Sequence, residues 1–343
     1  MFTFLKNWTL PSAITAGTLL YLLFAYVPEL DEASAVLGQL MESLLPVSIF
    51  LTLFVTFSKV DFHLMRLRRW HLCILAAQLL LIGVLVWLTL YSSLFSIPSF
   101  SMVGDGSFKL ILEAILICVI APCASASPVV TAKLGGDLTQ MTTFVLLSSA
   151  VASLLIPAVF PLIEPHQGIT FLSAFLVILQ KLALVLLLPL GLGAIVRHWI
   201  KPLYQWFVRT PDLGFYLWSI SLSITSGITV KNILHSNAGL WLLTAIALST
   251  LITSFVQFRI GRLIGRLFGE RICTGQAMFQ KNTGLAIWIA YVYLTPIASI
   301  GAGCYVLWQN LINSYELWQH RRTGAAAPCT TATTTTAQTH KLP

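Results

Sequence analysis

Apolar residues dominate the chain in long runs that short polar segments separate. Ten of these runs approach the roughly 20 residues that an α-helix needs to cross a bilayer. They lie at about 11–28, 38–58, 71–92, 109–134, 140–163, 171–197, 213–231, 237–257, 272–296 and 298–318. The pattern predicts an all-α polytopic membrane protein with ten transmembrane helices, the last two joined by a turn at Pro296.

Basic residues collect in alternate loops between the predicted helices, and the loops between these clusters are poor in Lys and Arg. The clusters are Lys59, Arg66, Arg68 and Arg69; Arg197, Lys201 and Arg209; Arg259, Arg262, Arg266 and Arg271; and Arg321 with Arg322. By the positive-inside rule, both termini are predicted to be cytoplasmic. We therefore expect a multi-pass protein of the plasma (inner) membrane.

Ten helices divide into two halves of five, at about 11–163 and 171–318. A second copy of an odd-numbered unit inserts upside down, so we expect two inverted repeats, which are recurrent in transporters. They would form a single transmembrane transporter domain over residues 1–320. Residues 321–343 are rich in Ala and Thr and are predicted to be a disordered cytoplasmic tail.

Composition supports the membrane assignment and excludes other classes. Hydrophobic residues make up 57% of the chain and charged residues only 9%, against about 25% charged in soluble domains. The net charge of +8 comes from the loops, so it indicates membrane orientation and no nucleic-acid surface. The six Cys have no framework spacing and no CxxC or paired His occurs, so neither a metal nor a cofactor is expected.

Two stretches break the apolar pattern at membrane depth, "APCASASP" at 121–128 and "GQAMFQKNTG" at 275–284. Polar groups are costly at this depth and mark a site by default. Lys281 lies nine residues after Ile272 and Pro128 nine before Asp137, which places both about 14 Å deep. We therefore expect helices 4 and 9 to be broken and to cross near the midplane.

The two stretches supply the candidate substrate- or ion-binding residues. They are Lys281, Asn282, Thr283, Gln280, Ser127, Ser125, Pro128 and Thr131, with Gln276, Cys123, Gln78 and Lys181 as additional candidates. Pro122 and Pro128 free nearby carbonyls, which is tolerated at depth only beside protein or a water-filled cavity. The structural alternatives are a Pro-kinked helix that serves packing alone and a lysine that snorkels or pairs structurally.

These residues resemble the bile acid:sodium symporter family. "APCASASPVVTAKLGGD" is similar to its helix 4 motif and "GQAMFQKNTGLAIW" to its helix 9 signature. "LPVSIFLTLFVTFSK" in helix 2 and "LALVLLLPLGLGAIVRHW" in helix 6 also match, so the resemblance covers residues 1 to about 320. It implies ten helices, a core domain and a panel domain, and crossing helices 4 and 9 around the binding site.

The chain departs from that family where sodium would bind. The resemblance implies a sodium-ligating Glu where this chain has Ala277, a second-site Gln where it has Lys281, and an Asn where it has Pro128. The helix 5 hydroxyls of the first sodium site fall at Met141 and Val145. Ser127, Asn282 and Thr283 are retained.

A hard cation needs oxygen ligands and negative charge, so an ammonium at this level is incompatible with sodium there. We expect Lys281 to take the ion's place, held by helix 4 carbonyls and the Ser127 hydroxyl. A desolvated amine gives up its proton more readily, so Lys281 could also carry a coupling proton. The alternative role for Lys281 is direct attraction of an anionic substrate.

The prediction is a secondary transporter that moves an organic anion or a small amphipathic solute by alternating access, without sodium at the usual site. Its expected partners are that solute, the lipid bilayer and possible coupling protons. The alternatives are an arsenite-type metalloid efflux carrier that uses Cys123 and a sodium-coupled symporter with relocated sites. Enzyme activity is disfavoured because all seven His lie at or beyond helix ends or in the tail. A channel is disfavoured because no filter-like segment repeats.

Overall fold

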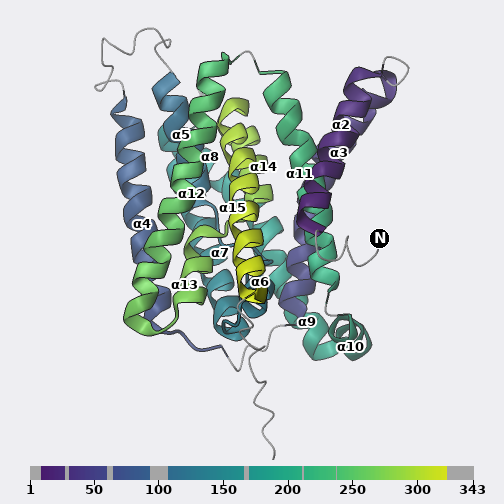
Figure 1. The fold of residues 1–343 in the computed structure, drawn as a ribbon, viewed down its shortest axis with the longest axis vertical. Coiled ribbons are helices and arrows are strands. Elements are labelled where there is room, and N and C mark those ends of the chain that lie inside the picture. Colours follow the sequence, from purple (N-terminus) through teal and green to yellow (C-terminus); the bar gives the residue numbers. More distant parts are fainter. Residues whose placement is uncertain are drawn as a thin grey trace, which may run out of the picture.

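The computed structural model describes residues 9–27, 31–59, 65–92, 107–165, 170–210, 212–236 and 238–322. Its regular elements are helices (Figure 1). In chain order they are α2 (Thr9–Tyr26), α3 (Asp31–Ser58), α4 (Arg69–Leu90), α5 (Ser107–Ile120), α6 (Ser127–Lys133), α7 (Leu138–Ile163), α8 (Phe171–Leu182), the π-helix η5 (Ala183–Leu187), α9 (Leu188–Trp199), α10 (Lys201–Arg209), α11 (Leu213–Leu234), α12 (Leu240–Phe268), α13 (Arg271–Phe279), α14 (Thr283–Tyr293) and α15 (Pro296–Arg322).

Several of these helices suit a bilayer. Six candidate membrane spans lie among the described residues: Gly38–Ser58, Arg69–Leu90, Leu138–Ile163, Phe171–Trp199, Leu213–Leu234 and Leu240–Phe268. Shorter apolar helices cover Pro11–Tyr26 and Thr283–Tyr293. Helices of this length and composition need a hydrocarbon environment, so the chain is an integral, multi-pass membrane protein.

The helices pack as two groups. In the panel group, α11 packs against both α2 and α3, and α3 packs against α9. In the core group, α12 packs against α13 and α15, and α5 packs against α15 and α4. α14 packs against α15 and α7 against α4, so both belong to the core group, and α8 continues through η5 into α9 of the panel group. The groups meet where α3 contacts α14, α11 contacts α15 and α8 contacts α7. Figure 1 shows the panel group on the right; α10 lies at the lower end of the molecule, and α5 begins at the upper end.

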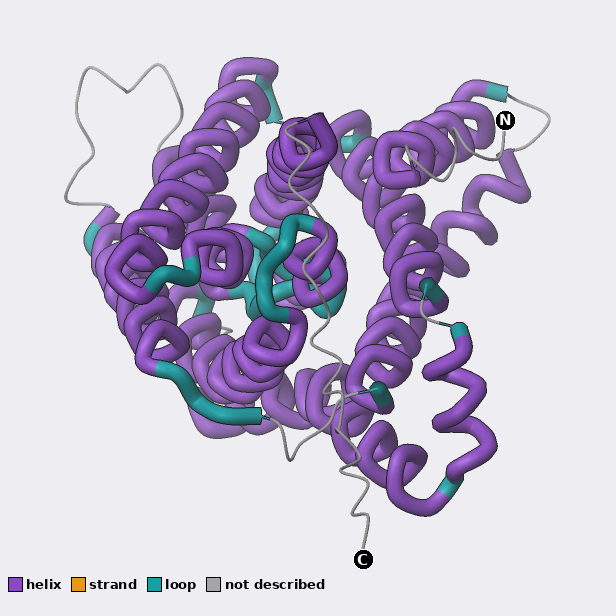
Figure 2. Tube along the Cα trace, turned by 60° about the horizontal axis from the view of Figure 1, so that its bottom comes forward, coloured by secondary structure: helices purple, strands orange, loops and turns teal. Residues whose placement is uncertain are grey.

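Both predicted breaks are present. α5 ends at Ile120 and α6 begins at Ser127, while α13 ends at Phe279 and α14 begins at Thr283. Figure 2 shows loop segments at the centre of the bundle, encircled by helices. Pro122 lacks an N–H for a helical bond, whereas Pro128 lies in the first turn of α6, where the missing N–H costs nothing. The Asn282 Oδ1 caps α14 by accepting a hydrogen bond from Leu285 N at 3.2 Å.

Four predicted features differ in detail. The segment Lys201–Arg209, predicted as loop, is the amphipathic helix α10. It has a basic residue at each end and three aromatic residues between them, a composition that suits a membrane interface. The predicted helix at 171–197 contains η5, whose wider turn precedes Pro189 in the first turn of α9. Pro296 begins α15, so the turn lies at 294–295. Of the predicted tail, Arg321 and Arg322 belong to α15, and 323–343 lie outside the described residues.

Candidate functional site

The two broken stretches bind each other through their backbones. Ala124 N donates to Gln280 O at 3.0 Å, and Asn282 N donates to Pro122 O at 2.8 Å. The two segments therefore run antiparallel, with Cys123 opposite Lys281. Backbone groups freed by a helix break must find partners inside the protein when no water is present. Each break satisfies the other, which explains why they occur as a pair.

Close packing behind the crossing fixes the position of α13. Gly261 of α12 faces Thr274, and a Cβ added at Gly261 would lie 2.4 Å from the Thr274 carbonyl oxygen. Any side chain larger than hydrogen would push α13 away from α12. The absence of a side chain at Gly261 thus allows the half-helix that leads to Lys281 to lie against its neighbour.

Lys281 is buried at the centre of the crossing, with 1% of its surface exposed. Its Nζ donates to Val119 O at 3.1 Å. Val119 is in the last turn of α5, where carbonyl groups lack helical partners and the helix dipole is negative. Gln78 Nε2 donates to the same carbonyl oxygen at 3.0 Å. The carbonyl end of α5 therefore stabilises the positive charge of Lys281.

A side chain of α15 holds the backbone of Lys281. Lys281 N donates to Gln309 Oε1 at 3.0 Å, and Gln309 Nε2 donates to Lys281 O at 3.3 Å. The same Nε2 lies 3.4 Å from Thr283 Oγ1. Sequence reasoning missed Gln309. Its signal was the polar run Gln309, Asn310 and Asn313 inside an otherwise apolar helix, where a polar group needs a stated partner.

The lysine has no acidic partner among the residues described. The ion pairs found there join Lys109 to Glu113 and Glu164, and Arg262 to Glu316. Oriented dipoles therefore stabilise the Lys281 ammonium in place of a carboxylate. The expected contact with the Ser127 hydroxyl is not the one observed, because Ser127 Oγ instead accepts from the Cys123 thiol at 3.2 Å.

Apolar side chains fill the positions that the family resemblance gives to sodium ligands. Met141, Val145 and Ala277 are each 0% exposed and lie in one buried apolar cluster with Cys123. None of their side chains offers an oxygen atom. Ser127 and Thr131 place hydroxyls in the same region and are fully buried, and Thr131 Oγ1 has no hydrogen-bond partner.

Two cavities lie between the panel and core groups. A small one of about 20 Å³, room for roughly one water, is lined by Ser125, Asn282 and Thr283 from the crossing. Thr52, Ser221 and Thr225 face it from α3 and α11. A larger one of about 270 Å³ includes Ser125, Pro128 and Phe215 in its lining. Ser125 borders both, so the larger cavity leads to the crossing. Lys281 lines neither.

Lys59 lies at the lower end of the larger cavity, beyond the last turn of α3. Its Nζ donates to Thr210 O at 2.9 Å. Burial lowers the pKa of the Lys59 amine, and the Asp212 carboxylate opposes that shift.

The remaining candidates divide between the core group and its surface. Gln276 Nε2 donates to Asn313 Oδ1 at 3.0 Å, while Gln280 is fully buried and neither polar atom of its side chain has a partner. Lys181 is exposed, and its ammonium lies 5.6 Å from the centre of the Tyr293 ring. Gln276 and Gln280 thus lie behind the crossing, and Lys181 is outside it.

Cys123 has no metal-binding neighbourhood in the described part of the chain. It is 1% exposed, and no group of three or more His, Cys, Asp or Glu side chains there is placed to hold a metal ion. The thiol instead donates to Ser127, as a buried structural cysteine does.

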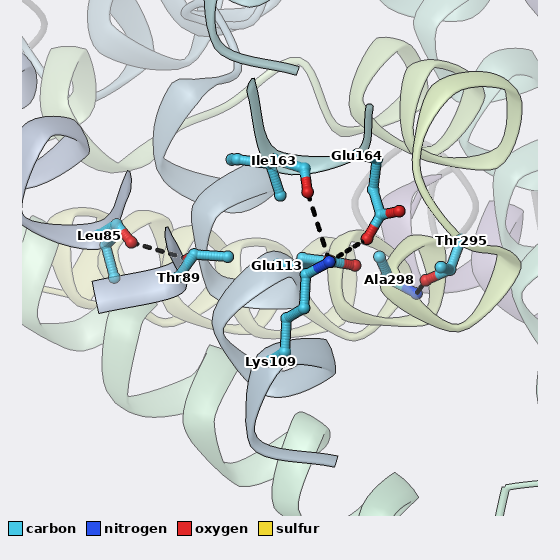
Figure 3. A network of polar contacts seen from close by, with 8 residues as sticks. All are labelled: Leu85, Thr89, Lys109, Glu113, Ile163, Glu164, Thr295 and Ala298. Carbon is cyan, nitrogen blue, oxygen red and sulfur yellow. Dashed lines mark hydrogen bonds and ion pairs between the residues drawn. The ribbon is translucent and has the colours of Figure 1, made fainter. Parts of the chain in front are cut away.

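Figure 3 shows a second polar cluster in the core group, at the upper end of α5. Lys109 Nζ donates to Glu164 Oε1 and, at 3.3 Å, to Ile163 O, and it lies 3.6 Å from Glu113 Oε1. This cluster contains the carboxylates that the crossing lacks.

Comparison with known proteins identifies the family. The family model described as the sodium bile acid symporter family matches residues 46–236, more than half of the chain. The match runs from α3 to α11 and includes the first of the two breaks. No curated protein matches the chain. With its multiple apolar helices and this match, the chain belongs to the sodium bile acid symporter family, a family of secondary membrane transporters and not of enzymes.

Proposed function

We propose that this secondary transporter moves an organic anion or a small amphipathic solute by alternating access, and that no sodium ion binds at the crossing. The observation that carries the proposal is the buried Lys281 amine, which donates to Val119 O and forms no ion pair with a carboxylate among the described residues. A fixed positive charge at this level repels a sodium ion, most strongly where little water screens it. Lys281 acts as a tethered cation in the ion's place.

The burial of Lys281 supports this role over direct substrate binding. Its side chain points to the end of α5, and it lines neither cavity between the groups. A residue that bound solute directly would need a polar atom on the cavity surface. In the proposal, the solute meets Ser125, Asn282 and Thr283, and Lys281 fixes the backbone that carries them.

The two cavities suit an amphipathic anion. The inner cavity is lined by hydroxyl groups and lies beside the start of α14, where free N–H groups and the helix dipole favour negative charge. The larger cavity adds apolar surface from Val55, Met65 and Phe215, as ligand pockets for apolar bodies do. A solute with an anionic group near Thr283 and an apolar body near Phe215 would occupy both cavities.

We further propose ten membrane crossings, in which α5 with α6, α8 with α9, and α13 with α14 each make one. Residues 11–163 and 171–318 would then be inverted repeats within a single domain over 1–320. Support comes from the antiparallel pairing of one broken helix from each half. Basic residues such as Arg69, Lys201 and Arg271 lie at the helix ends that this topology puts in the cytoplasm. With Lys59 at its mouth, the larger cavity would open to that side.

A sodium-coupled symporter with relocated sites is the second candidate, because buried amide groups lie behind the crossing. Gln257, Gln276, Gln280 and Asn310 each have a side-chain oxygen with no donor. Two amide nitrogens, Gln280 Nε2 and Asn313 Nδ2, also lack an acceptor. A cation would satisfy only the oxygens, whereas ordered water satisfies both. Ordered water therefore explains these unpaired oxygens and nitrogens better than a bound cation does.

A ligand screen followed by transport tests the proposal. Purified protein is heated with individual carboxylates and sulfonates, including taurocholate as a steroid sulfonate, in sodium chloride and in choline chloride. We expect an anion to raise the unfolding temperature equally in both salts, because Lys281 replaces the ion. The stabilising compound is then measured for uptake into proteoliposomes. Stabilisation by arsenite that Cys123→Ala abolishes would contradict the proposal in favour of a metalloid carrier.

A further inference from the structure

A fully buried carboxyl group lies midway along α5, one turn after Lys109. Glu113 is 0% exposed, and neither of its oxygens accepts a hydrogen bond. The nearest positive charge is Lys109 Nζ, at 3.6 Å. A carboxylate without donors in such a place is costly, and an ionisable group inside a membrane protein is a functional-site hypothesis by default.

The Lys109 ammonium pairs more closely with Glu164 than with Glu113. Lys109 Nζ donates to Glu164 and to Ile163 O at 3.3 Å, so Glu113 receives only a longer ion-pair contact (Figure 3). The side chains of Lys109 and Glu164 are 37% and 32% exposed, against 0% for Glu113. Water therefore reaches the Lys109–Glu164 pair but not the Glu113 carboxyl.

Among the described residues, Lys109 is the one basic side chain that forms an ion pair with Glu113; the helices packed on α5 add none. These are α15, α12, α4, α14 and α7. The titratable groups that these helices place beside this region are the Tyr293 phenol of α14, which has no hydrogen-bond partner, and the Cys304 thiol of α15, which lies in a buried cluster with Ala114. Both are uncharged in their protonated forms. The Lys181 ammonium of α8 lies 5.6 Å from the centre of the Tyr293 ring. Glu113, Glu164 and Lys109 together carry a charge of −1 when all are ionised. One added proton makes the three groups neutral.

We propose that Glu113 is a proton-binding site that exchanges with water at the upper end of the protein. A proton from water joins a carboxylate oxygen of Glu113, and the new O–H donates to the Glu164 carboxylate, which contacts the same Lys109 ammonium. Release reverses the step: the O–H bond breaks, the electron pair stays on Glu113 and the proton returns to water. Two carboxyl groups that share one proton are a stable arrangement when like charges are close.

The position of Glu113 links this proton to the crossing. Glu113 and Val119 lie six residues apart on α5, about 9 Å along the helix, and Val119 O accepts from Lys281. The proton would therefore bind at the middle of the half-helix whose last turn accepts the hydrogen bond of the tethered cation. Proton coupling of transport rests on the proposed function, whereas proton binding by Glu113 does not.

Infrared difference spectra between buffers of about pH 6 and about pH 9, where carboxyl groups of ordinary pKa stay ionised, test the binding directly, on full-length protein in liposomes without solute. The wild type should show the carbonyl band of a protonated carboxylic acid that disappears at alkaline pH. Glu113→Gln should lose this band, while Asp212→Asn, which removes an acid at the start of α11, should keep it. An unchanged band in Glu113→Gln would overturn the proposal.

Thermal unfolding across pH is the second readout. Wild-type stability should fall as pH rises through the loss of the proton, because a second carboxylate then faces one ammonium. Glu113→Gln should lose this pH dependence. If that variant fails to fold, Glu164→Gln should move the transition to lower pH, because Lys109 then pairs with Glu113 alone. A Glu164→Gln profile identical to the wild type would contradict the proposal. Neither result depends on sodium or solute, so the proposed transport function can fail independently.

Discussion

A lysine ammonium lies at each end of helix α5. Lys109 belongs to the helix, whereas Lys281 reaches its last turn from the second broken stretch, and the two are stabilised in opposite ways. Lys109, in its first turn, pairs with Glu164 and lies 3.6 Å from Glu113. Lys281, at its last turn, has no acidic partner in the described residues and donates to Val119 O. Lys109 is 37% exposed in its side chain, whereas Lys281 as a residue is 1% exposed.

The difference teaches what each ammonium does. A partly exposed lysine beside two carboxylates forms an ion pair that adds little to stability. It can neutralise only one of the two carboxylates. A buried ammonium that has only carbonyl dipoles occupies a place made for a cation, because the end of a helix presents several carbonyl oxygens and negative potential. In our proposal, Lys281 is therefore a structural charge at the crossing, and the cluster of Lys109, Glu113 and Glu164 holds the exchangeable proton.

Lys281→Met should have the largest effect on transport. The variant keeps most of the side-chain volume and removes the ammonium, so Val119 O loses a charge-assisted donor worth about 1.5–3 kcal/mol. We expect uptake to fall about 10- to 100-fold. The unfolding temperature should change little, because removing a buried charge also removes its desolvation cost. Lys181→Met, at the exposed lysine outside the crossing, is the matched control and should transport normally. Wild-type uptake by Lys281→Met would contradict the tethered-cation role.

Lys109→Met tests the other end of α5, because it removes the ammonium that pairs with the carboxylates. It leaves the Glu113 and Glu164 carboxyls without their ammonium, so the free energy of unfolding should fall by about 1–2 kcal/mol at neutral pH, a value reduced for exposure. The loss should be smaller in acid, where protonation removes the repulsion. Urea unfolding at two pH values measures this. Equal losses at both values would show that the cluster does not titrate.

Gln309→Leu should sharpen the account of how Lys281 is positioned. It removes the two hydrogen bonds to the Lys281 backbone, each worth about 1 kcal/mol. We expect a stability loss of about 1–2 kcal/mol together with reduced uptake. Asn310→Leu on the same helix is the control, because Asn310 Nδ2 donates only to Val306 O of its own helix. If both variants lose uptake equally, the contact of Gln309 with Lys281 has no special role.

Cys123→Ala should have the smallest effect. The thiol donates a weak hydrogen bond to Ser127 at 3.2 Å, so stability should fall by less than about 1 kcal/mol. Uptake of an anionic solute should persist.

Sequence patterns predicted the interrupted helices well and their partners poorly. Pro122, Pro128 and the polar residues before Thr283 carry local signals, because proline and polar groups disturb a helix wherever it folds. Val119 and Thr225 carry none, because their roles depend on which helices pack together. The polar run at Gln309 was a signal, but for the same reason it did not reveal the partner of Gln309. α10 was missed for a related reason: a short amphipathic helix has the composition of a loop and needs a surface to stabilise it. The position of Lys181 outside the crossing likewise depends on helix rotation.

The most direct measurement is uptake of the identified anion into proteoliposomes in which sodium is replaced by N-methyl-D-glucamine at fixed pH and membrane potential. With Lys281 intact, the account predicts equal initial rates in both media. In the same assay, Ala277→Glu combined with Lys281→Gln restores two ligand types expected at a sodium site and should gain sodium dependence. Sodium-stimulated uptake by the wild-type protein would contradict the central claim that Lys281 takes the ion's place.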